Sequence, residues 1–121
     1  MNNKQIELIK NALRQVARYM PAKAIALELA RNWLDHGVRG GAKYRCAECA
    51  KSFGSKEVQV DHIQPVVPLD REIKDWNEYM SRLFCSSDNL QVLCKPCHKD
   101  KCNEETKIRT QFKHSLIKPD N

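Results

Sequence analysis

The chain has 121 residues, of which 41% are hydrophobic and 30% charged, proportions that fit one soluble globular domain. It contains 21 lysines and arginines against 15 acidic residues, and the net charge of +6 indicates either a polyanionic partner or a generally basic surface. No apolar run approaches the roughly 18–20 residues of a membrane span, and the N-terminus lacks a secretory pattern. We therefore expect a cytoplasmic protein without a membrane partner, acting in the host cytoplasm if the chain is viral.

Two helices are predicted at the N-terminal end. Apolar residues recur at helical spacing over residues 1–20, and Pro21 is suited to start a second helix. The helical period continues to about His36, where Gly37 is expected as the C-terminal cap. Residues 37–42 then predict a flexible basic joint.

The remaining elements alternate between short strands and helices. Residues 56–60 alternate polar and apolar side chains, which predicts a strand, and residues 71–84 carry a helical stripe of aromatic and aliphatic side chains expected in the core. A second short strand is predicted over residues 90–93, and Pro96 suits the first turn of a final helix. The polar end, residues 113–121, is expected to fray.

Six cysteines are many for a chain of this length, and their spacing is informative. Four of them form two Cys-x-x-Cys motifs, Cys46/Cys49 and Cys94/Cys97, which together can supply the four thiolates of a tetrahedral structural zinc site. Disulfides or free thiols are the alternatives, and a reducing compartment disfavours the disulfides. Cys85 is expected to be a core thiol, and Cys102 a small buried residue or a bystander.

Polar residues accompany the two predicted strands in a fixed order. Asp61 and His62 follow the first strand, Asn89 precedes the second, and His98 lies on the helix after it. Each has an ordinary explanation alone, because Asp-His pairs are common, Asn89 fits a turn and His98 fits a spare zinc ligand. Together they offer an imidazole that can serve as a base, and an oxygen and a nitrogen ligand for a divalent ion.

These residues carry a resemblance to a known family. The segments 60–63, 88–94 and 97–101, read Val-Asp-His-Ile, Asp-Asn-Leu-Gln-Val-Leu-Cys and Cys-His-Lys-Asp-Lys, resemble the HNH nucleases, above all the small free-standing bacteriophage proteins with a four-cysteine zinc site. The resemblance extends from about Tyr44 to Lys101. It implies an α+β fold with a ββα-metal core, preceded by two N-terminal helices and carrying a helical insertion between the two core strands.

The predicted organisation has two parts within a single compact domain. Residues 1–42 form a helical segment that packs on the core, and residues 43–121 form the HNH core with its zinc site and a basic tail.

The resemblance also implies a role for each site residue. His62 matches the family's general base, Asp61 and His98 match the ligands of the catalytic divalent ion, and Asn89 matches a positioning residue that braces the loop after the first strand. Mg²⁺ or Mn²⁺ is the expected catalytic ion, with Ni²⁺ or Zn²⁺ also compatible with an imidazole ligand. Lys99 and Lys101 are expected to contact DNA phosphates, although a solvated helix face would account for them nearly as well.

The resulting functional hypothesis is a monomeric endonuclease that nicks or cuts double-stranded DNA and needs no small-molecule cofactor. The main alternative is a zinc-stabilised DNA-binding module without turnover. A third hypothesis, a domain that binds partners other than nucleic acid, is less attractive because of the basic surplus.

Overall fold

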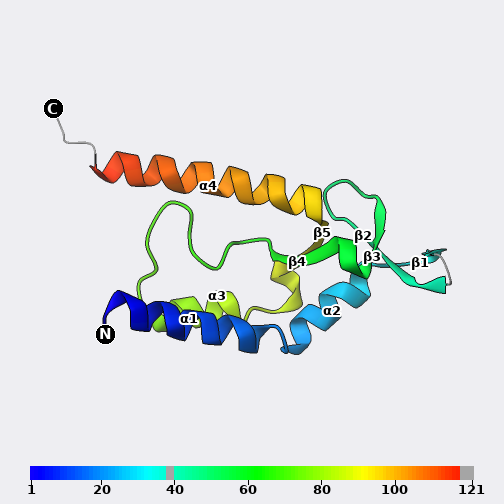
Figure 1. Ribbon diagram of the computed structural model, residues 1–121, viewed down its shortest axis with the longest axis horizontal. Coiled ribbons are helices and arrows are strands. Elements are labelled where there is room, and N and C mark those ends of the chain that lie inside the picture. The colour runs from blue at the N-terminus through cyan, green and yellow to red at the C-terminus, as the bar shows by residue number, and fades with distance from the viewer. Residues whose placement is uncertain (38–39, 118–121) are drawn as a thin grey trace.

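The computed structural model describes residues 1–37 and 40–117. Four α-helices and two small antiparallel sheets make up this part of the chain, in agreement with the expected α+β class. In Figure 1 the long helix α4 (Lys95–Ile117) forms one arm, while α1 (Asn3–Ala17) and α3 (Trp76–Leu83) lie together in the other. Among the described residues, no helix combines the length and apolar character required to cross a bilayer.

The first helix has a strong start. The Asn2 side-chain oxygen accepts a hydrogen bond from the backbone N–H of Gln5, and the Gln5 side-chain oxygen accepts one from the backbone N–H of Asn2. This reciprocal capping box satisfies two donors that a helix N-terminus otherwise leaves unpaired. The second helix, α2 (Pro21–Ala30), opens on its proline as predicted.

The prediction that this helix continues to His36 is wrong. Residues Arg31–His36 form strand β1, and Gly37 is therefore not a helix cap. The Asn32 side chain accepts from the backbone N–H of Leu34 and donates to Ser52 Oγ, so it stabilises an extended chain in competition with the helix. Strand pairing overrides the helical period of the apolar residues here.

Strand β1 belongs to a three-stranded sheet that the sequence did not reveal. Its order is β1-β2-β3, with β2 at Ala42–Arg45 and β3 at Ser52–Gly54. Of the predicted joint at residues 37–42, positions 38 and 39 lie outside the described residues.

The second sheet is the predicted pair of strands. Strands β4 (Val58–His62) and β5 (Leu90–Cys94) pair antiparallel in unbroken register from Val58 opposite Cys94 to His62 opposite Leu90. The first two residues expected in β4, at 56 and 57, belong instead to a short 3-10 helix, Ser55–Glu57. A second 3-10 turn, Ser87–Asn89, leads into β5.

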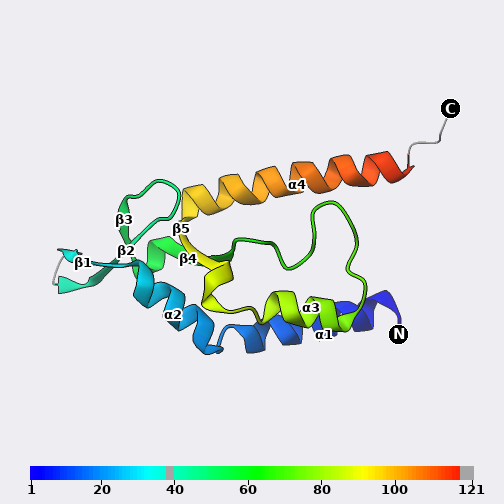
Figure 2. The same ribbon diagram turned by 180° about the vertical axis from the view of Figure 1, so that it is seen from behind.

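The insertion between these strands contains α3, which is shorter than the predicted helix at 71–84. Asp75 caps it by accepting from the backbone N–H of Glu78, and the preceding residues are not helical. The loop before the helix is held by guanidinium groups. Arg82 donates to the carbonyls of Pro65 and Val66, and Arg109 of α4 donates to that of Val67. Figure 2 shows this loop between α4 and the α1–α3 pair.

The final helix is longer than expected, because residues 113–117 continue α4, while the rest of the predicted frayed end, 118–121, lies outside the described residues.

Among the described residues, two small hydrophobic clusters stabilise the fold. One joins α1 to α3 through Ala17, Tyr79 and Leu83, which confirms that the aromatic stripe of the insertion is core. The other contains Cys46, Leu93 and Cys94 beside Phe53 and Cys97. The second cluster is built mainly from cysteines, so its stability depends on what those thiols bind.

Tyr79 provides a test of the first cluster. Its ring is 1% exposed and stacks edge-on against Trp76, while its hydroxyl has no hydrogen-bond partner among the described residues. We expect Tyr79→Phe to change the free energy of unfolding by less than about 1 kcal/mol, or to raise it, because the unpaired hydroxyl is removed. Tyr79→Ala should lower it by about 3–5 kcal/mol through the cavity it leaves.

Chemical denaturation of both variants and the wild type measures these differences. A large loss of stability in Tyr79→Phe would mean that the hydroxyl has a partner after all.

Candidate metal centre and active site

The two Cys-x-x-Cys motifs meet at one site, which confirms the prediction made from their spacing. The Sγ atoms of Cys46, Cys49, Cys94 and Cys97 all lie within 4.8 Å of one another. A tetrahedral zinc ion with Zn–S bonds of about 2.3 Å separates its sulfurs by about 3.8 Å, so the cluster is close to the required geometry. The cysteines therefore form a set able to hold a zinc ion.

Backbone hydrogen bonds position the first motif on the second sheet. Cys46 lies just after β2, and its N–H donates to the carbonyl of Lys51 within the turn. The next N–H, of Ala47, donates to the carbonyl of Val92 in β5. Cys94 ends that same strand, and Cys97 lies in the first turn of α4. The cluster thus joins the β2–β3 turn, β5 and α4 at one point.

The environment of the thiols favours a bound cation. Burial opposes ionisation of Cys46, but hydrogen bonds from the backbone N–H groups of Cys49, Cys94 and Glu48 outweigh it and lower its pKa to about 6. The opposite holds for Cys97, where the hydrogen bond with the Cys94 side chain, followed by burial, raises the pKa to about 12. Without a metal, therefore, the Cys46 thiol ionises readily, whereas ionisation of the Cys97 thiol is disfavoured.

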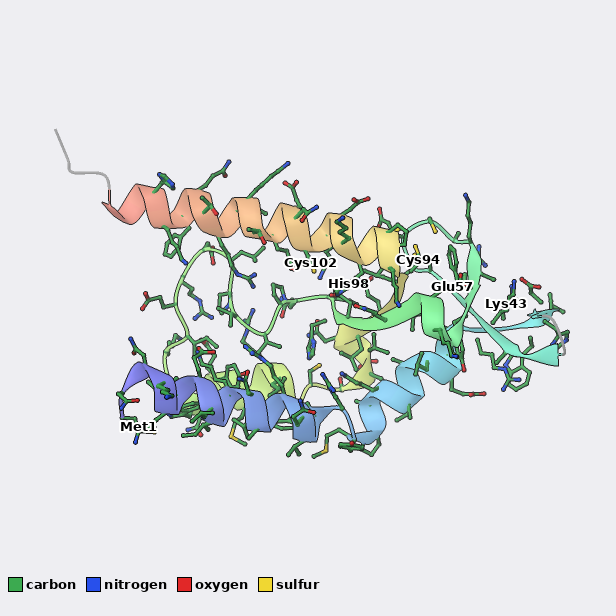
Figure 3. All side chains as sticks on the ribbon, in the orientation of Figure 1. Met1, Lys43, Glu57, Cys94, His98 and Cys102 are labelled. Atoms are coloured by element: carbon green, nitrogen blue, oxygen red, sulfur yellow. The ribbon has the colours of Figure 1, made fainter. Side chains whose placement is uncertain are left out.

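A second polar cluster surrounds Asp61, which is 9% exposed. Its Oδ2 accepts from Gln91 Nε2 at 3.0 Å and lies 2.7 Å from Lys101 Nζ. Its Oδ1 faces Nε2 of His98 at 3.6 Å. Figure 3 shows His98 on the side of α4 that faces β4.

These atoms pass a simple test for a shared divalent ion. Nitrogen and oxygen ligands each about 2.1 Å from a cation lie about 3.0–3.5 Å apart, so Asp61 Oδ1 and His98 Nε2 are close to ligand spacing. Oδ2 already has two donors, which leaves Oδ1 to coordinate. The pair leaves room for water and phosphate oxygens in the coordination sphere.

His62 points to the other side of β4. Its Nε2 lies 3.2 Å from the carbonyl oxygen of Leu83, at the end of α3. A carbonyl only accepts, so this contact puts the ring proton on Nε2 and leaves Nδ1 of the neutral ring as a proton acceptor. Asp61 and His62 leave β4 on opposite sides, as the alternation of strand side chains dictates. His62 is the last residue of the strand, so a substrate at the strand end lies beside both side chains.

Asn89 connects the loop after β4 to the start of β5. Its Oδ1 accepts from the backbone N–H of Gln64 at 2.9 Å, and its Nδ2 donates to the carbonyl of the same residue at 3.3 Å. Its own carbonyl accepts from the N–H of Ile63. Three hydrogen bonds therefore fix the backbone immediately after His62.

The two lysines predicted to contact phosphates lie in different surroundings. Lys99 is exposed on α4, whereas Lys101 points inward. In addition to Asp61, Lys101 Nζ contacts the backbone carbonyl of His62 at 2.7 Å and Glu105 at 3.4 Å. The lysine thus links α4 to both site residues of β4.

Sequence reasoning missed Gln91 and the internal role of Lys101. Gln91 is the cross-strand partner of Asp61, so the pairing of the two predicted strands would have identified it. Lys101 follows His98 by three residues and therefore lies on the same helix face. Cys102 was expected to be buried or a bystander, and it is exposed, with its Sγ 3.8 Å from the His98 ring.

Comparison with known proteins supports the resemblance to HNH nucleases. The chain is 43% identical to a probable HNH endonuclease of Lactococcus phage SK1 over 68 residues, which cover 55% of this chain and 63% of the phage protein. It is also 40% identical over 55 residues to the mouse DNA annealing helicase and endonuclease ZRANB3, covering 46% of this chain and 4% of that protein. No family model and no solved structure matches.

The chain thus spans less than two thirds of either relative. The predicted resemblance to HNH endonucleases is confirmed by the match to the phage protein together with the four-cysteine cluster.

The cysteine cluster generates a prediction. Cys46→Ser should remove zinc and lower the melting temperature strongly, because a buried, ionised sulfur is replaced by a weak ligand. Zinc affinity of the wild type should rise with pH. The Cys97 thiol, with a pKa of about 12 in the metal-free protein, must release its proton when it binds the ion.

Elemental analysis, thermal melting and metal titration at two pH values measure these effects. Cys102→Ser is the matched control, since Cys102 is exposed and outside the cluster. Equal zinc content in both variants would show that Cys46 is not a zinc ligand.

Proposed function

We propose that this chain is a metal-dependent HNH endonuclease that hydrolyses phosphodiester bonds of double-stranded DNA. The observation that carries the proposal is the arrangement at the end of β4. Asp61 and His98 present an oxygen and a nitrogen 3.6 Å apart, and His62 has one ring nitrogen held by a carbonyl and the other left to accept a proton. The similarity to a probable HNH endonuclease supports the same reading.

In this proposal β4, β5 and α4 form a ββα-metal core. Asp61 and His98 hold the catalytic divalent ion, for which Mg²⁺ and Mn²⁺ are the first candidates. When bound, that ion stabilises negative charge on the phosphate and on the leaving 3′-oxygen. The four cysteines hold a structural zinc ion, and residues 1–42 support the core formed by 43–121.

His62 acts as the general base. Nδ1 takes a proton from a water molecule whose oxygen attacks phosphorus, and the bond to the 3′-oxygen breaks to leave 5′-phosphate and 3′-hydroxyl ends. The Leu83 carbonyl keeps the ring in the tautomer that this step needs and stabilises the imidazolium formed. Asn89 holds the adjoining backbone, so the ring keeps its direction through the reaction.

Lys101 and Gln91 orient the metal-binding carboxylate. Both contact Oδ2 of Asp61, which directs Oδ1 toward His98. A DNA-binding module without turnover would have no use for a carboxylate, an imidazole ligand and a base arranged in this way. The catalytic reading is therefore preferred over a zinc-stabilised binding module.

Replacing the base tests the proposal. His62→Ala should reduce plasmid nicking in Mn²⁺ or Mg²⁺ by at least about 10²-fold, because no other group accepts the proton from water. Zinc content and melting temperature should stay near those of the wild type. His114→Ala, at an exposed position on α4, is the matched control and should retain full activity.

Nicking by His62→Ala at the wild-type rate would exclude the assigned base. Absence of nicking by the wild type in every divalent ion tried would favour the binding module.

Asn89 gives a second, graded test. Asn89→Ala loses both side-chain hydrogen bonds to Gln64 and should lower kcat by roughly ten- to a hundredfold with little change in KM, because the base is misdirected. Asn89→Asp keeps the acceptor for the Gln64 N–H and should fall between Ala and wild type. Equal activity of all three proteins would show that the loop needs no such brace.

A further inference from the structure

The sheet that the sequence did not reveal provides a surface that the proposed catalytic site does not use. Strands β1 and β2 form a ribbon that extends away from the helices in both ribbon views. Its base is fastened to β3 by the hydrogen bond from Asn32 to Ser52. Near its tip the Gly37 N–H donates to the carbonyl of Gly41. The ribbon is therefore a built element with paired backbone groups.

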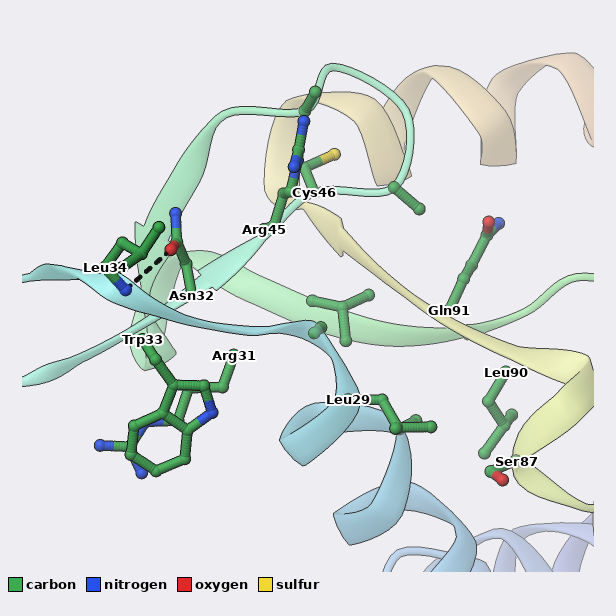
Figure 4. A pocket seen from close by; sticks show the side chains of 15 residues that line it. Leu29, Arg31, Asn32, Trp33, Leu34, Arg45, Cys46, Ser87, Leu90 and Gln91 are labelled. Carbon is green, nitrogen blue, oxygen red and sulfur yellow. Dashed lines mark hydrogen bonds between the residues drawn. The ribbon is translucent and has the colours of Figure 1, made fainter.

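Large apolar side chains are exposed where this ribbon joins α2. Leu29 is 77% exposed, Trp33 58% and Leu34 97%. The guanidinium of Arg31 lies over the Trp33 ring at 3.6 Å, and Figure 4 shows the two stacked side chains. A cation held on the face of an exposed indole combines a flat stacking surface with positive charge.

A hollow of about 830 Å³ lies beside this surface and reaches β5, the strand that pairs with β4. It lies between the end of α2, the ribbon and β5, and Trp33, Arg45 and Gln91 are among its lining residues. Gln91 is the residue that donates to the Asp61 carboxylate. The hollow and the proposed site of phosphodiester hydrolysis thus share Gln91.

The charge of the ribbon fits a polyanion. Its two strands carry three cations, Arg31, Lys43 and Arg45, against one acid, Asp35. A second copy of the chain would bring these cations against one another, whereas a phosphate backbone would neutralise them. The dimensions also suit this ligand, because the major groove of duplex DNA admits a two-stranded ribbon.

We infer that the β1–β2 ribbon is a DNA-binding arm that grips the duplex beside the scissile phosphate. Arg45 and Lys43 contact phosphates, and the Arg31–Trp33 pair packs against sugars and base edges in the groove. The inference rests on the proposed function only in taking duplex DNA as the ligand. It assigns anchoring on DNA to the ribbon and leaves hydrolysis to the site at β4 and α4.

The test measures binding without cleavage. Zinc-loaded protein is titrated into a fluorescently labelled 20-base-pair duplex with no added Mg²⁺ or Mn²⁺, and anisotropy is followed at several salt concentrations. Trp33→Ala should weaken binding about five- to a hundredfold, and Trp33→Phe, which keeps a stacking ring, should lose much less. Affinity falls as salt concentration rises, and Arg45→Ala should make the slope of log affinity against log salt concentration shallower by about 0.9, the value of one phosphate contact.

The matched control is Tyr19→Ala, which removes an aromatic side chain 87% exposed at the junction of α1 and α2, on neither strand of the ribbon. It should bind as the wild type does. Zinc content and circular dichroism verify that each variant is folded, and Arg45→Ala tests the arm independently of the indole.

Wild-type affinity in both Trp33→Ala and Arg45→Ala overturns the arm, as does failure of the wild type to bind duplex at all. The DNA-binding arm is also overturned if Trp33→Ala leaves DNA binding unchanged but converts a dimer to a monomer in sedimentation. The ribbon would then be a contact between two copies of the chain. These outcomes are separate from the proposed function. If both variants bind DNA and nick it as the wild type does, only the assignment of the ribbon as a DNA-binding arm is rejected. If binding depends on the ribbon but the wild type does not nick DNA, only the proposed nuclease function is rejected.

Discussion

The convergence of the four sulfurs of Cys46, Cys49, Cys94 and Cys97 is the constraint on which the rest of this structure depends. Cys94 ends β5 and Cys97 lies in the first turn of α4, so the cluster fixes where that helix leaves the sheet. His98 and Lys101 follow on the same helix, and their distances to Asp61 are set by that departure. Because the described residues form two small hydrophobic clusters, a metal ion bound by these sulfurs would supply rigidity that side-chain packing alone does not.

The Asp61 carboxylate shows how that rigidity is used. One of its oxygens is held by an amide and an ammonium group, and the other faces an imidazole. The charge of a nearly buried acid is thus balanced by neighbours on two separate elements, β5 and α4. On the opposite side of the strand, the end of α3 orients His62 through a single carbonyl. The insertion is therefore part of the site as well as part of the core.

The placement of the candidate site residues was largely predictable from the sequence, because they lie at the ends of strands and near the start of a helix. The two strands and the meeting of the cysteines followed from alternation and spacing. Strand β1 was not predictable, since Leu29 and Trp33 continue a helical period that the hydrogen bonds of Asn32 override. The inward turn of Lys101 depends on the distance between α4 and β4, which no local pattern encodes.

The pairing of β4 with β5 across a long insertion has a consequence for the order of events during synthesis. Residues 63–89 lie between the two strands, and both His98 and half of the cysteines come after them. A ribosome that has delivered only the first ninety residues has therefore made neither the complete four-cysteine cluster nor both of the proposed ligands of the catalytic ion. Under the proposed function, the nascent chain would therefore be inactive on DNA until His98 has been synthesised and has packed against Asp61.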